Sequence, residues 1–128
     1  MKQFLAKGNH KSGHIDHVYE IQVLSYFDED EQVYYAICPA LDIVGGGKTE
    51  EEAITSFNIS LDEFVKYTCN KRTIARELMR LGWEVHLKGR NHFKAKSPSV
   101  EELKNNPEWA EVWAKAPHVA NRTVQLAA

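Results

Sequence analysis

Long apolar runs are missing from this chain: no stretch of about 18 apolar residues exists, so we expect no membrane-spanning helix. The first eleven residues also carry too little apolar sequence for a secretory signal. Cysteine is scarce, and Cys38 and Cys69 lack the C-x-x-C spacing of a metal or redox pair. Both are expected to be reduced, partly buried side chains, and a cytoplasmic location is the default that follows.

Proline and glycine are not in excess, with four and seven residues, and 43% of the 128 residues are hydrophobic. This composition favours a folded core over disorder. The length fits one domain with an appendage. We divide the chain into a loose polar arm at 1–14, a main domain at 15–70, and an extension at 71–128 that packs on the main domain or is swapped with it.

Charge is distributed unevenly along the chain, although the net charge is only −2. Between Asp16 and Glu63 there are twelve acidic residues and one basic residue, Lys48. Between Lys66 and Lys96 there are nine basic residues and two acidic ones. Such segregation steers association with charged partners. The acidic segment suggests a basic protein partner, whereas the basic segment fits either nucleic acid or a solvated face.

The first half of the chain predicts a small antiparallel sheet followed by a long helix. Alternating apolar residues predict strands at Val18–Phe27 and Val33–Cys38, joined by an acidic hairpin loop. A short strand at Asp42–Val44 enters a glycine turn at 45–47. Thr49 and Glu52 form a capping-box pattern that opens a helix from Glu50 to about Thr68. Its inward stripe comprises Ala53, Ile54, Phe57, Leu61, Phe64, Val65 and Thr68.

The second half is expected to contribute helices and a terminal strand, which completes an α+β fold class. The pattern predicts a helix at Thr73–Leu81 ended by Gly82, and a strand at Trp83–Leu87. The pattern also indicates a short strand near Phe93. A second capping box, Ser99 with Glu102, opens a short helix, and Pro107 starts another whose Trp109 and Trp113 pack in the core. The segment Arg122–Leu126 alternates as a terminal strand.

Motifs for catalysis, metals and nucleotides are weak. The triple glycine lacks the G-x-x-x-x-G-K-[ST] spacing of a phosphate loop, and Glu50, Glu51 and Glu52 would repel a phosphate. A tight turn that needs positive φ accounts for these glycines without a ligand. The six histidines show no HExxH pattern, and Cys38 before Pro39 is typical of a packing residue. We therefore expect no enzyme activity, no cofactor and no metal.

One family resemblance covers somewhat over a third of the chain, from Tyr19 to about Val65. A strand with Tyr34, Tyr35 and Ala36 is followed by Pro39, then by a glycine-rich turn into T-x-E-E-A at Thr49, Glu51, Glu52 and Ala53. These features resemble the HicB antitoxin family. The resemblance implies a partial RNase H-like β-β-β-α-β unit that neutralises a small HicA-type mRNA-cleaving toxin. Members commonly repress their own transcription through a C-terminal DNA-binding segment, but residues 70–128 show no helix-turn-helix.

Three hypotheses of function follow. The first is a non-enzymatic, HicB-like protein that binds a small basic toxin and self-associates through the sheet edge and the terminal strand; its candidate contact residues are Glu20, Tyr34, Asp42 and Glu51. The second is nucleic-acid binding through the basic segment 66–96, with DNA as one possible partner and with candidates Lys71, Arg72, Arg76, Arg80, Lys88 and Arg90. The third is a ribonuclease that uses His92.

Overall fold

The computed structural model describes residues 16–71, 73–88, 93–115 and 117–127. The elements follow the order β1 (Asp16–Asp28), β2 (Val33–Cys38), β3 (Ile43–Gly47), α1 (Glu50–Lys71), α2 (Ile74–Arg80), β4 (Glu84–Leu87), β5 (Phe93–Lys96), α3 (Val100–Asn105), the 3₁₀ helix η1 (Pro107–Trp109), α4 (Ala110–Ala114) and β6 (His118–Ala127). The chain is therefore an α+β protein with a small antiparallel sheet, as predicted. The predicted arm, residues 1–14, lies outside the described residues.

The main sheet has the strand order β3-β2-β1-β6, and every neighbouring pair is antiparallel. Strand β1 is its spine: Asp16–Ser25 pairs with β6, whereas Leu24–Asp28 pairs with β2. The terminal strand is longer than the predicted Arg122–Leu126 and joins this sheet within the same chain. The last strand of the chain therefore completes the sheet begun by the first.

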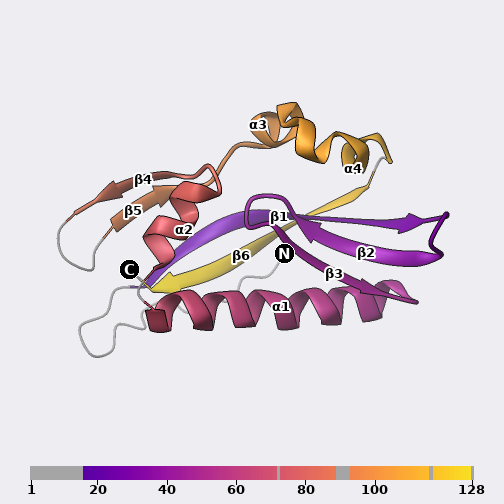
Figure 1. Cartoon of the computed structure of the whole chain (residues 1–128), viewed down its shortest axis with the longest axis horizontal. Coiled ribbons are helices and arrows are strands. Elements are labelled where there is room, and N and C mark those ends of the chain that lie inside the picture. Colours follow the sequence, from indigo (N-terminus) through magenta and orange to yellow (C-terminus); the bar gives the residue numbers. More distant parts are fainter. Residues whose placement is uncertain (1–15, 72, 89–92, 116, 128) are drawn as a thin grey trace.

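Helices lie on both sides of the main sheet (Figure 1). Helix α1 covers one face and buries Ala53, Phe57 and Leu61. Segment α3–α4 lies on the opposite side, where a smaller cluster forms from Leu24, Ile37, Trp109 and Val112. The core role predicted for Trp109 is confirmed, because its side chain is buried. Ile54 was expected inward and is exposed, because the contact line of α1 runs through its neighbour Ala53.

The prediction of a glycine turn is wrong, because Gly45–Gly47 form the second half of strand β3. None of the three has a positive φ. Instead, α1 lies directly against two of them: a Cβ added at Gly45 would sit 2.3 Å from the backbone nitrogen of Phe57, and one at Gly47 would sit 2.4 Å from Cβ of Glu52. The glycines therefore permit close approach of helix to strand. Positive φ is found at Gly82, which ends α2 as predicted.

Helix α1 starts at the predicted residue, Glu50, and runs to Lys71, three residues past the predicted end. Its cap differs from the expected box. The Glu52 amide donates to Thr49 Oγ1 at 3.1 Å, but the Glu52 carboxylate accepts from the Lys48 amide at 2.9 Å rather than from Thr49. The second box, Ser99 with Glu102, has both reciprocal bonds. Each cap satisfies amides that a helix start leaves without partners.

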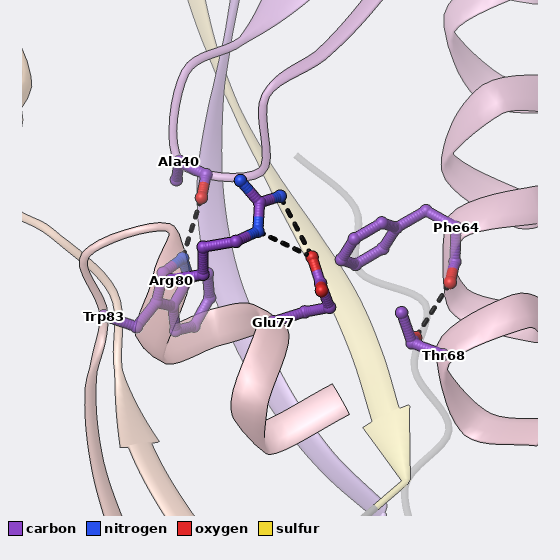
Figure 2. A network of polar contacts seen from close by, with 6 residues as sticks. All are labelled: Ala40, Phe64, Thr68, Glu77, Arg80 and Trp83. Atoms are coloured by element: carbon purple, nitrogen blue, oxygen red, sulfur yellow. Dashed lines mark hydrogen bonds and ion pairs between the residues drawn. The ribbon is translucent and has the colours of Figure 1, made fainter. Parts of the chain in front are cut away.

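Strands β4 and β5 form a separate two-stranded sheet, which we call the ribbon. Trp83, immediately before β4, attaches it to the main body. The indole Nε1 donates a buried hydrogen bond of 2.8 Å to the carbonyl of Ala40, in the β2–β3 turn (Figure 2). The Trp83 ring also meets Tyr19 of β1 edge to face, with centroids 5.4 Å apart. One tryptophan thus joins the ribbon, a turn and the spine strand.

No helix in the described part of the chain combines the length and the apolarity that a membrane crossing needs.

Candidate partner-binding surfaces at the two ends

The acidic residues of two elements gather at one end of the molecule. The β1–β2 hairpin and the start of α1 lie at this end (Figure 1), because Tyr34 of β2 pairs with Gly47, three residues before α1. We define the acidic end as Asp28, Glu29, Asp30, Glu31, Glu50, Glu51 and Glu52. Negative charge in the first turn of α1 also interacts favourably with the helix dipole.

Three carboxylates of the acidic end have structural roles. Asp28 accepts a bond from the Glu31 amide at 3.1 Å, and Glu52 accepts the bond from Lys48 described above. Glu31 accepts a hydrogen bond from the Tyr35 hydroxyl, and this bond raises the pKa of Tyr35 to about 12. The side chains of the other four form no ion pair or hydrogen bond with described residues: Glu29, Asp30, Glu50 and Glu51. These four are free to meet a partner.

Apolar side chains are exposed beside these carboxylates. Phe27, the residue before the hairpin, is 37% exposed, and its ring lies 4.7 Å from that of Tyr34. Ile54, one turn into α1, is 41% exposed. An apolar centre with a charged rim is the usual arrangement of a protein-binding surface.

The four predicted partner-binding residues do not form one surface. Tyr34 and Glu51 lie at the acidic end, Tyr34 partly buried and Glu51 exposed. Glu20 is exposed in the middle of β1, where it pairs with Thr123 of β6. Asp42 lies in the β2–β3 turn, at the other end of β2 from the hairpin, and lines a cleft of about 390 Å³ with Arg80. The sequence alone did not show at which end of the sheet each of these four residues lies.

The opposite end of the molecule is basic and is built from α2 and the ribbon (Figure 1). In the ribbon Val85, Ala95 and Phe93 turn toward the core, and their neighbours turn outward. The exposed basic residues of this end, which we call the basic end, are Arg76, Arg80, Lys88, Lys94 and Lys96. An open groove of about 510 Å³ runs along the ribbon, lined by Val18, Tyr19, Glu84, His86, Lys94, Ala95 and Lys96.

The predicted nucleic-acid residues are described only in part. Arg76 and Lys88 are exposed, as is Arg80, which holds Glu77 through a 2.9 Å ion pair (Figure 2). The side chain of Lys71 and the residues Arg72 and Arg90 lie outside the described part of the chain, and so does His92 of the ribonuclease hypothesis. The structure adds an arrangement that the sequence did not show, since Lys94 and Lys96 share one face of a strand pair.

Groups with possible chemical reactivity are dispersed. Cys38 is fully buried in β2, and burial raises the pKa of its thiol to about 11, so it stays protonated at neutral pH. His86 lies 3.6 Å from Glu84 on the exposed ribbon. Within the described residues, no three histidine, cysteine or carboxylate side chains gather in a metal-binding arrangement.

Comparison with protein families, with curated proteins and with solved structures finds no match to this chain.

Proposed function

We propose that this chain is a HicB-like antitoxin, a non-enzymatic protein that neutralises a small basic mRNA-cleaving toxin by binding it at the acidic end. The observation that carries the proposal is the set of four carboxylates without partners among described residues, Glu29, Asp30, Glu50 and Glu51, next to exposed Phe27. A toxin that binds RNA has a positive surface, which is the complement of this end.

The two kinds of residue at the acidic end have different tasks in this proposal. The carboxylates accelerate association with a basic protein and make it depend on salt. Phe27, Tyr34 and Ile54 supply the apolar area whose burial stabilises the complex. Because the four free carboxylates are exposed, holding them near one another requires little desolvation in the unbound protein.

The fold gives further support to the resemblance. Elements β1, β2, β3 and α1 follow the family's β-β-β-α order, and β6 supplies a later strand in the same sheet. The motif residues occupy structural positions: Pro39 follows the last residue of β2, and Thr49 caps α1. In this proposal, β1–β3, α1 and β6 would form the partial RNase H-like unit, although α2, the ribbon and α3–α4 intervene between α1 and β6.

Self-association belongs to the same proposal and would use the outer edge of β6. The two edges of the main sheet differ. Helix α1 lies beside the β3 edge, where the Gly46 amide donates to Ser56 Oγ at 3.3 Å. Strand β6 pairs with β1 on its inner side, and no described strand pairs with its outer side. An open edge of ten residues is a template for pairing with a second copy of the chain.

Co-expression with a candidate toxin, meaning a small basic protein from a neighbouring gene, tests the proposal. We expect the partner alone to arrest growth, and the wild-type chain to restore growth and to co-purify with it. The double variant D30N/E51Q should restore growth poorly, because it removes two free carboxylates of the acidic end. The control D62N/E101Q removes the same charge from the outer side of α1 and from α3. Equal rescue by both variants, or no complex with the wild type, would refute the proposal.

A further inference from the structure

We propose that the basic end binds the phosphate backbone of nucleic acid, independently of base sequence, through the outward face of the β4–β5 ribbon. This activity is separate from the toxin-binding surface, which lies at the other end of the molecule (Figure 1). It therefore requires no partner protein and can be tested on the chain alone.

The ribbon presents its positive charges in a regular array. The register pairs Glu84 with Lys96 and His86 with Lys94, so these four side chains share one face. All four are exposed, whereas Phe93 on the other face is buried. Residues two apart on a strand are separated by about 7 Å, which places Lys94 and Lys96 in a row along the groove. The buried hydrogen bond of Trp83 holds this row against the main body.

The lysines share this face with one carboxylate, Glu84, which pairs with Lys96 in the register. Lys88, Lys94, Lys96 and the neighbouring Arg76 of α2 form no ion pair within the described part of the chain. Two carboxylates lie nearby. Glu77 is held by Arg80 at 2.9 Å, and Glu84 lies 3.6 Å from His86.

Glu20, on the adjacent spine strand, is a third carboxylate near the groove, and its backbone carbonyl accepts a 3.4 Å bond from Ser97. Over the described side chains of this end, the five cations outnumber the three carboxylates: Arg76, Arg80, Lys88, Lys94 and Lys96 against Glu20, Glu77 and Glu84. The face has a positive surplus that a polyanion would neutralise with release of counterions.

The shape of the ribbon favours nucleic acid over a lipid surface. A two-stranded ribbon has the dimensions that the major groove of a duplex admits, and the row of lysines on β5 can contact successive phosphates of one strand. Stable attachment to a membrane needs inserted apolar groups or an acyl chain in addition to basic residues. On the described part of the ribbon, Leu87 is the large apolar side chain that is strongly exposed, at 66%. Leu87 pairs with Phe93 and so lies on the face opposite the lysines. Val18 is the exposed apolar residue that lines the groove, at 47%, and these two side chains are too little for a membrane anchor.

Fluorescence anisotropy with a labelled DNA of about 20 nucleotides, single-stranded and duplex, tests the proposal between about 20 and 200 mM salt. We expect affinity to fall linearly with salt on logarithmic axes for two unrelated base sequences alike. The variant K94Q/K96Q should bind at least about tenfold more weakly at low salt. The magnitude of its salt slope should decrease by about 0.7 to 0.9 for each phosphate that the variant no longer neutralises.

The control K48Q/K104Q removes the same charge from the loop before α1 and from α3, and should bind DNA as the wild type does. The conservative variant K94R/K96R should retain both affinity and slope. No DNA binding by the wild type at low salt, or equal losses in the two glutamine variants, would overturn the proposal. So would binding only to anionic lipid vesicles, or only to the acidic end of a second copy, seen as salt-sensitive self-association that K94Q/K96Q abolishes.

Discussion

The acidic and basic ends of this molecule differ in the structural elements that carry their charged residues. The acidic end is an integral part of the main unit, because its carboxylates sit on a hairpin of the central sheet and on the helix that packs across that sheet. The basic end is a small two-stranded sheet with one short helix, attached through Trp83. The charges that are segregated along the sequence are therefore also separated in space, because the fold places the two segments at opposite ends of the molecule (Figure 1).

The largest expected effect concerns the contact that supports the acidic end. In Gly45→Ala the new Cβ would lie 2.3 Å from a backbone nitrogen and 2.6 Å from Cα of Phe57, so α1 must move away from β3. We expect the free energy of unfolding to fall by about 3 kcal/mol, measured by urea denaturation. Gly46→Ala is the matched control, because its Cβ would meet the Tyr35 ring at 3.3 Å and that ring can shift. Equal losses in the two variants would show that helix approach does not require the glycine.

The second largest effect is expected where the basic end is attached to the main body, at Trp83. Trp83→Phe removes the indole donor and leaves the buried Ala40 carbonyl without its 2.8 Å partner. We expect a loss of about 2 kcal/mol, the penalty for an unsatisfied buried acceptor. Amide hydrogen exchange should accelerate in β4 and β5 more than in β2 and β3. Uniform acceleration across both sheets would mean that the ribbon unfolds only together with the main body.

A smaller effect is expected at the start of α1. Thr49→Ala removes the hydroxyl that accepts from the Glu52 amide at 3.1 Å, and should destabilise the protein by about 1 kcal/mol in thermal or urea unfolding. Thr55→Ala, at an exposed position inside the same helix, is the control and should change stability little. If both variants behave alike, the cap does not contribute to the stability of the acidic end.

The smallest effect is a titration. The hydrogen bond to Glu31 raises the pKa of Tyr35 from its usual value near 10 to about 12. The contribution of this hydrogen bond to stability is therefore complete below pH 10 and is lost as the pH rises through about 12. Absorbance at alkaline pH should show a late phenolate component that Tyr35→Phe removes. Glu31→Gln should move that component toward lower pH. A component that persists in Tyr35→Phe would assign it to another tyrosine.

Much of the local structure could be predicted from the sequence, because strands and helix starts depend on short-range patterns. The bounds of β2 and the first residue of α1 match the prediction. The glycines were misassigned because glycine serves both turns and close packing, and only the position of Phe57 on α1, against Gly45, distinguishes the two. The distribution of charge along the sequence indicated an acidic and a basic pole, but it did not show which residues belong to each. Glu20 and Asp42 are acidic, yet in the fold both lie away from the hairpin and from the start of α1.

We propose that a basic protein docks on the acidic end, and a binding titration tests this docking most directly. The dissociation constant for the co-expressed partner should rise about tenfold in D30N/E51Q, equivalent to about 1.4 kcal/mol, with a weaker dependence on salt. It should stay unchanged in D62N/E101Q and in K94Q/K96Q. A partner whose affinity is insensitive to D30N/E51Q, or whose binding instead disappears in K94Q/K96Q, would contradict the account.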